Sequence, residues 1–258
     1  MKNHISFSEL KIWNECPYKH KLVYLDKVEN FVGNEHTAFG TAMHYVCENA
    51  VTNEKTDLLY AFNTKFLEEL KLLIEKKVEI KKDLVEAMKG QGKKMINHIL
   101  PALKSRFKNF EVVSVEEMLY EPIDNKKTKF KGYIDLVIKT PDDKYHVIDW
   151  KTCSWGWDSR KKTDRMVTYQ LTLYKYYFAK KHDIDIEKIS TYFALLKRTA
   201  KSNNVEIFEV PNGKIKTKNV LNLLDGALYN IEHGKFIKNR LSCTRGYGCE
   251  FYKTEHCK

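Results

Sequence analysis

The sequence predicts an α/β protein in which a mixed β-sheet core is flanked by helices, with a helical N-terminal region and a cysteine-bearing C-terminal tail. Three observations support this prediction. Helical periodicity dominates residues 1–110, apolar strand-like segments begin at residue 111, and residues 235–258 read as an irregular tail with three cysteines. No internal repeat or Pro/Gly/Ser-rich linker divides the 258 residues. We therefore expect a single domain over residues 1–258, with its sheet core at about 111–234.

Two helices are predicted near the start of the chain. The stretch SFSE, from Ser6 to Glu9, has the form of a capping box and begins a helix that runs towards Cys16. The second helix covers HTAFGTAMHYVCENAV, where apolar side chains recur at helical spacing: Phe39, Met43, Val46 and Ala50.

Longer amphipathic patterns follow at residues 56–78 and 83–108. The second pattern is weakened near Gly90 and Gly92 and at Pro101, since glycine and proline disfavour helix interiors. The basic run in this region, EKKVEIKK, is interpreted as a solvated helix face, with a path for DNA as the alternative.

The second half of the chain alternates between strand and helix patterns. Five segments read as strands, at 111–120, 129–139, 144–150, 190–197 and 204–210. Helices are predicted at about 163–181 and 217–233.

Composition limits the classes of function. An apolar content of 43% is enough for a sizeable core, and no apolar run approaches the roughly 20 residues of a membrane span. The N-terminal stretch MKNHISFSELKIW lacks the apolar segment of a secretory signal, so we expect a cytoplasmic protein with no membrane partner. The net charge of +11 suits a polyanion such as nucleic acid, although a lysine-rich proteome would give the same balance.

The stretch GYIDLVIKTPDDKYHVIDWKT reads as a β-hairpin with charged residues inside its strands. If its turn centres on Asp142, Asp135 and Asp149 lie opposite each other, with Cβ atoms roughly 4.5–5.5 Å apart. Two carboxylates at that distance repel unless a cation lies between them, and Mg²⁺ prefers carboxylate oxygen. Lys151 shares a strand face with Asp149 and could reach an anion held there. The alternative is a pair of exposed acids on a solvated sheet face.

Five features together resemble the PD-(D/E)XK nucleases, in the form found in RecB-type and CRISPR-adaptation nucleases and in many phage exonucleases. The hairpin resembles the family's central motif. In chain order the other four are ISFSELKIWNECPYKHKLVYL with its Cys16–Pro17 pair, FGTAMH ending at His44, YQLTLY with Gln170 and Tyr174, and the C-terminal cysteines. The resemblance implies a restriction-endonuclease-like fold.

The resemblance also implies roles for individual residues. Asp135, Asp149, His44 and the backbone carbonyl of Trp150 would bind a catalytic Mg²⁺ or Mn²⁺ ion. Lys151 would position or activate the attacking water. Gln170 and Tyr174, four residues apart on one helix face, would help to organise the site and the DNA strand. Ile134 stands where the family name has proline, a position that often differs in the RecB-type branch.

Cysteines at both ends of the chain form a further candidate site. Cys243, Cys249 and Cys257 lie in the tail, and Cys16 lies near the N-terminus. Spacing alone leaves an iron–sulfur cluster, zinc and unligated thiols open. Iron–sulfur members of the resembled family pair one N-terminal cysteine with three C-terminal ones, which implies a structural [4Fe–4S] cluster. The C-terminal spacing is longer here than is usual in that family.

A loop after the second hairpin strand combines aromatic and basic residues. Trp155 and Trp157, in CSWGWDSRKK, precede the run Arg160–Lys162. Aromatic and cationic side chains together suit stacking on single-stranded bases. A hydrophobic plug beside the sheet is the equal alternative.

These patterns predict a metal-dependent DNA nuclease, an exonuclease acting on single strands or DNA ends in recombination, repair or replication. The alternatives are a non-catalytic nucleic-acid-binding module on a nuclease fold and a zinc-stabilised nucleic-acid-binding protein. Cleavage polarity and oligomeric state stay open at this point.

Overall fold

A computed structural model describes residues 3–28, 31–53, 55–244, 246 and 248–258. The chain forms two compact units. The sheet unit contains Val32–Met118 and Tyr133–Asn212, and the terminal unit contains Met1–Phe31, Leu119–Gly132 and Gly213–Lys258. The expectation of one nuclease domain over residues 1–258 stays a prediction. Among the described residues, no helix is both long enough and apolar enough to cross a membrane.

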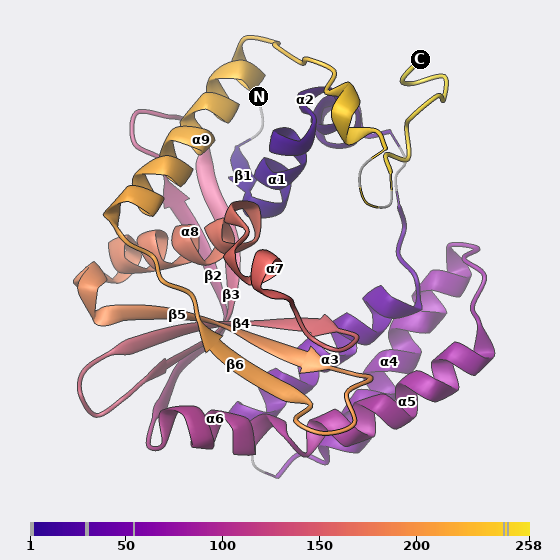
Figure 1. Cartoon of the computed structure of the whole chain (residues 1–258), viewed down its shortest axis with the longest axis vertical. Coiled ribbons are helices and arrows are strands. Elements are labelled where there is room, and N and C mark those ends of the chain that lie inside the picture. Colours follow the sequence, from indigo (N-terminus) through magenta and orange to yellow (C-terminus); the bar gives the residue numbers. More distant parts are fainter. Residues whose placement is uncertain (1–2, 29–30, 54, 245, 247) are drawn as a thin grey trace. The chain divides into compact units, whose positions relative to one another are not determined.

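Over the described residues, six strands form a mixed sheet in the order β1-β3-β4-β5-β6, with β2 also paired to β3 (Figure 1). Their bounds are β1 His4–Ser6, β2 Glu111–Pro122, β3 Lys129–Lys139, β4 Tyr145–Cys153, β5 Ile189–Lys197 and β6 Val205–Glu209. Strands β3 and β4 are antiparallel, β4 and β5 parallel, and β5 and β6 antiparallel. The mixed α/β sheet predicted from the sequence is confirmed. β1 was not predicted, because three residues are too few to show a period.

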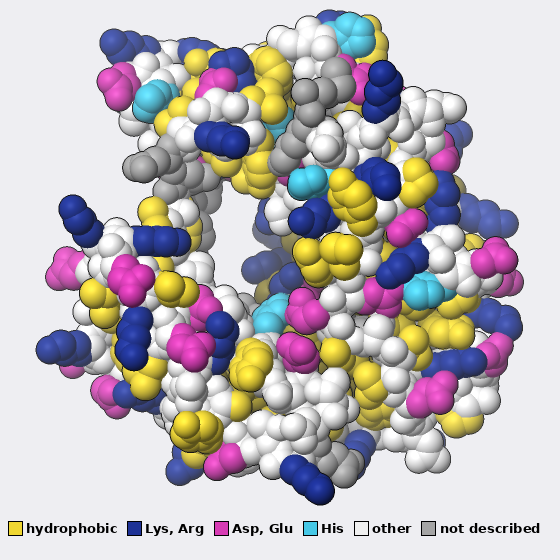
Figure 2. Space-filling model, turned by 180° about the vertical axis from the view of Figure 1, so that it is seen from behind, with side chains coloured by type: hydrophobic (Ala, Val, Ile, Leu, Met, Phe, Trp, Pro, Cys, Tyr) yellow, Lys and Arg dark blue, Asp and Glu magenta, His cyan; other side chains and the backbone are white. Residues whose placement is uncertain are grey.

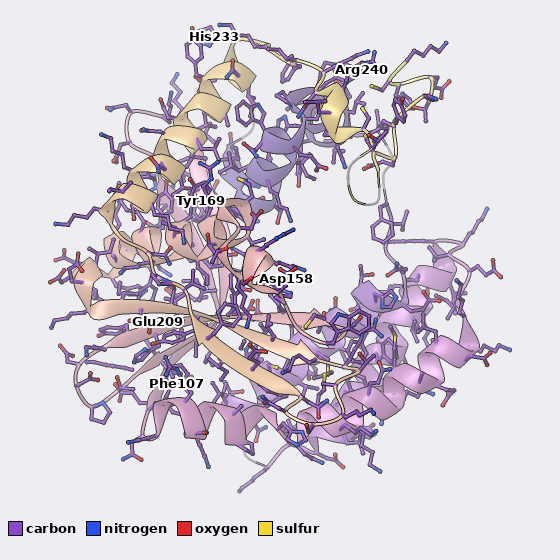
Figure 3. All side chains as sticks on the ribbon, in the orientation of Figure 1. Phe107, Asp158, Tyr169, Glu209, His233 and Arg240 are labelled. Atoms are coloured by element: carbon purple, nitrogen blue, oxygen red, sulfur yellow. The ribbon has the colours of Figure 1, made fainter. Side chains whose placement is uncertain are left out.

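Helices cover both faces of the sheet within the sheet unit. Their bounds are α3 Glu35–Thr52, α4 Leu58–Glu75, α5 Lys82–Ile96, α6 Ile99–Phe107, α7 Ser159–Thr163, α8 Arg165–His182 and η2 Ile186–Lys188. Helices α3 to α6 share one apolar core with Leu136, Ile148 and Trp150 of the hairpin. On this face Phe107 of α6, which Figure 3 labels, contacts the rings of His146 and Tyr192. Helix α8 packs against β4 and β5 with none of its residues in that core, which assigns it to the opposite face.

The predicted helix at 83–108 is two helices, and this part of the prediction is wrong. The break falls at Asn97 and His98 rather than at the glycines or the proline. Pro101 is tolerated because it lies in the first turn of α6, where backbone N–H groups have no partner within the helix. Gly92 has a packing reason, since a Cβ there would collide with the ring of Phe62 on α4.

The terminal unit holds both ends of the chain. Its helical segments are α1 Phe7–Glu15, α2 Pro17–His20, the π-helical η1 Lys21–Leu25, α9 Lys214–Glu232 and η3 Arg240–Ser242. Ser6 caps α1 as predicted, since its Oγ accepts a hydrogen bond from the N–H of Glu9. The carboxylate of Glu9 is buried and lies 2.9 Å from His20 Nε2, which ties α1 to α2. Figure 1 shows α9 beside α1, and the two helices are in contact.

Basic side chains are abundant in both units. Figure 2 shows Lys and Arg side chains over one face of the molecule, with Asp and Glu side chains interspersed among them. Because basic and acidic side chains are mixed on this face, charge alone does not mark a path for nucleic acid on it.

Candidate metal centre

The β3–β4 hairpin sets the two aspartates opposite each other. Val137 pairs with Val147 and Leu136 with Ile148, so continuing this register by one residue brings Asp135 opposite Asp149. The predicted turn centre at Asp142 is therefore confirmed. Asp135 Oδ2 also accepts a hydrogen bond of 2.7 Å from the backbone N–H of Trp150, which fixes the carboxylate against β4.

Asp149 is the buried acid of the pair. Its side chain is 1% exposed, and Lys151 Nζ lies 2.6 Å from its Oδ2 atom. Burial raises the pKa of Asp149 to about 6, and the charge of Asp135 adds to this against the opposing effect of Lys151. Burial alone would lower the pKa of Lys151, but the charges of Asp149 and Asp135 outweigh it and raise that pKa. Lys151 is therefore a permanent cation beside two acids.

Helix α3 brings His44 to this pair. His44 Nδ1 lies 3.5 Å from Asp135 Oδ2. Burial alone would lower the pKa of His44, but Asp135 raises it above its ordinary value. One turn earlier, a Cβ on Gly40 would lie 3.4 Å from Thr152 Oγ1 on β4, which is an ordinary van der Waals contact. The histidine of FGTAMH therefore lies in the site, whereas packing does not require its glycine.

Glu116 of β2 also reaches the site, which sequence reasoning missed. Ligand atoms of His44, Glu116 and Asp135 all lie within 4.8 Å of one another. Burial raises the pKa of Glu116, and the charge of Asp135 raises it further. A signal for this residue was present in the sequence as the doublet Glu116–Glu117 within a strand pattern, where strict alternation would allow only one side chain to face the core.

The residues of this site fit a hard divalent cation. Asp149 Oδ2 is buried, and its close polar neighbour among the described residues is Lys151 Nζ at 2.6 Å. The available donors are carboxylate oxygens and an imidazole nitrogen. Carboxylate oxygen is the ligand that Mg²⁺ prefers, and imidazole nitrogen is acceptable to the divalent transition metals. A cation would offset the repulsion between the acids.

Helix α8 supplies two further predicted residues. Gln170 Nε2 donates a hydrogen bond of 3.1 Å to Tyr174 Oη. Burial raises the pKa of Tyr174, and the charge of Asp149 raises it further, so the phenol stays protonated near the acids. Figure 3 labels Tyr169, next to Gln170 on this helix. The structure therefore pairs His44 with Asp135 and Lys151 with Asp149, and it places Tyr174 where both acids act on its pKa. Asp149 is not part of the group of described residues whose ligand atoms lie within 4.8 Å of one another.

The two tryptophans of the following loop differ in their surroundings. Trp157 packs against Phe193 and Phe208, with Lys161 Nζ 4.7 Å from its ring centroid. Trp155 is 78% exposed. Trp157 is therefore the hydrophobic plug beside the sheet. Of the two tryptophans, Trp155 is the one whose ring is exposed enough to stack on a base. Asp158, labelled in Figure 3, caps α7 just beyond this loop.

The four cysteines of the predicted cluster come together in the terminal unit. Cys16, Cys243, Cys249 and Cys257 all line a single cavity, and all four are free thiols. Cys16 Sγ accepts hydrogen bonds from the backbone N–H groups of Lys19 and Asn239. Four cysteine sulfurs around one cavity are the donor set that zinc and iron–sulfur clusters take. The set fits a four-thiolate group.

A family model of the PD-(D/E)XK nuclease superfamily matches residues 4–252. The chain belongs to the PD-(D/E)XK nuclease superfamily. Its fold is similar to that of a putative exonuclease from Eubacterium rectale, with a TM-score of 0.60, 13% identity, and coverage of 94% of this chain and 86% of that chain. A structure of the protein SSO0001 aligns at 15% identity and a TM-score of 0.39, covering 89% of this chain and 77% of that one. No curated protein matches the chain.

Proposed function

We propose that the protein is a metal-dependent deoxyribonuclease of the RecB-type branch, an exonuclease acting on single-stranded DNA or DNA ends. The observation that carries the proposal is the convergence of Asp135, Asp149, Lys151 and His44 on one site, in a chain of a nuclease superfamily. The retained ligands and lysine favour catalysis over a non-catalytic binding module. DNA recombination, repair or replication is the process that such an activity would serve.

His44, Asp135, Asp149 and the carbonyl of Trp150 would hold Mg²⁺ or Mn²⁺. When bound, the metal lowers the pKa of a coordinated water and polarises the phosphate that it contacts. Lys151 keeps its charge at neutral pH because Asp149 raises its pKa, so it can stabilise charge that develops on the phosphate. Gln170 orients the Tyr174 hydroxyl, which stays protonated and can donate to a substrate oxygen.

The exposed ring of Trp155 supports a preference for single strands, since bases that are unpaired can stack on an aromatic side chain. It lies four residues after Lys151, just past the end of β4. We propose that it contacts a base of the strand whose phosphate is cleaved.

A structural [4Fe–4S] cluster is proposed for Cys16, Cys243, Cys249 and Cys257. The shared cavity supports it, and so do the cations of Lys19, Lys238 and Arg240 that line the same cavity and would offset thiolate charge. A cluster would close a very long loop between the two ends of the chain, which restricts the unfolded state. Protein purified without oxygen should be brown, and Cys16→Ser should lose both the colour and thermal stability. A colourless preparation that contains stoichiometric zinc would show that the four cysteines bind zinc and not an iron–sulfur cluster.

The nuclease proposal is tested with end-labelled single-stranded and double-stranded DNA, incubated with Mg²⁺, with Mn²⁺ or with EDTA. Release of short products from one end, in a metal-dependent manner and faster on single strands, is the expected result. Binding that falls steeply with salt should accompany it, since cationic side chains displace counterions from phosphates. Binding without cleavage under every metal condition would leave the non-catalytic module as the function.

A further inference from the structure

We propose that Glu116 of β2 is an additional carboxylate ligand of the divalent metal ion held by His44 and Asp135. This inference rests on the proposed function, because it adds a residue to the same metal centre. With Glu116 included, three separate segments of the sheet unit would hold one ion: α3, β2 and β3.

The distances suit a single ion. Ligand atoms of His44, Glu116 and Asp135 lie within 4.8 Å of one another. In an octahedral Mg²⁺ site with bonds of about 2.1 Å, opposite ligand atoms are about 4.2 Å apart. Adjacent ligand atoms of such a site are about 3 Å apart. The three donors lie near enough for one ion to contact all of them once the side chains turn towards it. Glu48, one turn beyond His44 on α3, lies outside this group.

The backbone of β2 is bent in a way that serves this contact. Glu116 has a φ of 46°, which is left-handed backbone for a residue that is not glycine. Such a conformation costs on the order of 1 kcal/mol in a non-glycine residue. A regular strand would avoid this cost, so the surrounding structure imposes the bend.

The neighbours of Glu116 show what the bend does. Val115 packs against the apolar core under α3. Glu117 pairs with Lys181 Nζ at 2.7 Å, on α8 at the opposite face. Residues two apart in a regular strand share a face, so the alternation is broken between these two, as it is in a β-bulge. The bulge directs Glu116 out of the regular pattern and towards His44 and Asp135.

The charges of the site are consistent with a cation at this position. Glu116, Asp135 and Asp149 contribute three carboxylates, and Lys151 contributes one permanent positive charge. A divalent ion neutralises the remaining carboxylates, whereas an unfilled site leaves like charges within a few ångströms.

Binding of Mn²⁺ in the absence of nucleic acid tests the proposal, measured by calorimetry on the full chain. The main variant is Glu116→Asn, because asparagine tolerates left-handed backbone better than glutamate and cannot supply a carboxylate. We expect Mn²⁺ to bind at least about 10-fold more weakly. In EDTA the variant should be as stable as the wild type or more so. A purely structural role for Glu116 predicts a less stable variant that binds Mn²⁺ normally.

Three further variants complete the test. Glu116→Gln should repeat the loss of affinity while keeping the side-chain length, and it replaces Glu116→Asn if that variant fails to fold. Glu48→Gln is the matched control and should bind Mn²⁺ as the wild type does. Asp135→Asn tests the underlying centre. Loss of binding in Asp135→Asn with wild-type affinity in both Glu116 variants overturns this inference alone, whereas normal binding in Asp135→Asn overturns the metal centre itself.

Discussion

The buried carboxylate of Asp149 should make the metal-free protein less stable as the pH rises. Its pKa is about 6 in the folded protein, against 3.8 for an ordinary aspartate. The folded state therefore holds the proton more tightly than the unfolded state does. The stabilisation is fully present below about pH 4 and is lost as the pH rises through about 6. Since one pKa unit corresponds to about 1.4 kcal/mol, the charged carboxylate costs the fold on the order of 3 kcal/mol.

Urea unfolding in EDTA, from about pH 4 to pH 7, measures this cost. Other carboxylates titrate in the same range, so the quantity compared is the difference in unfolding free energy between wild type and Asp149→Asn. We expect this difference to change by up to about 3 kcal/mol across the window, with the wild type losing stability relative to the variant. Lys151 stays charged throughout in the wild type, because its pKa is raised. Glu68→Gln, at an exposed position on α4, should follow the wild type at every pH.

Adding Mg²⁺ should reverse the loss of stability that the wild type shows, relative to Asp149→Asn, as the pH rises. A metal ion binds the ionised carboxylate, so the stabilisation that it provides should grow as the pH rises past 6. Unfolding free energies of wild type and Asp149→Asn that run parallel in EDTA across the whole window would refute the reasoning. They would mean that Asp149 is ionised without cost in the folded protein.

The other predictions concern catalysis, packing and substrate contact. Lys151→Ala should lower cleavage by about 100-fold or more while leaving DNA binding in EDTA largely intact, and cleavage at the wild-type rate would remove this residue from the mechanism. Gly90→Ala should stabilise the protein by about 0.5–1 kcal/mol in urea unfolding, since nothing lies within 4 Å of a Cβ there, whereas Gly92→Ala should destabilise it despite the same gain in helix propensity. Equal effects of the two alanines would contradict the tight packing of α5 on α4. Trp155→Ala should weaken single-stranded DNA binding by about 1–3 kcal/mol, measured by anisotropy in EDTA. The matched control is Tyr60→Ala, a 71% exposed aromatic on α4, which should have no effect.

The hairpin could be predicted in detail because two independent constraints fix it. Side chains alternate along a strand, and a turn centred on Asp142 sets the register, so together they bring Asp135 opposite Asp149. The helix break at Asn97 and His98 could not be predicted in the same way. Gly92 gave a stronger local signal for a helix break than Asn97 or His98 did. The structure shows instead that Gly92 makes room for the ring of Phe62 from another helix. A sequence shows the propensity of a residue and not the neighbour that it meets.

His44 could be predicted from the sequence, whereas Glu116 could not. His44 stands in a regular helix, so the spacing of the apolar side chains around it fixes the direction in which it points. Glu116 stands in a strand whose alternation it interrupts. An alternating pattern assigns Val115 and Glu117 to one face, whereas the structure has them on opposite faces. A bulge moves every residue beyond it to the other face, so a strand pattern read without the bulge misplaces the acid next to it. Acids at such irregular strand positions therefore become candidate ligands only once the neighbouring strands and helices are known.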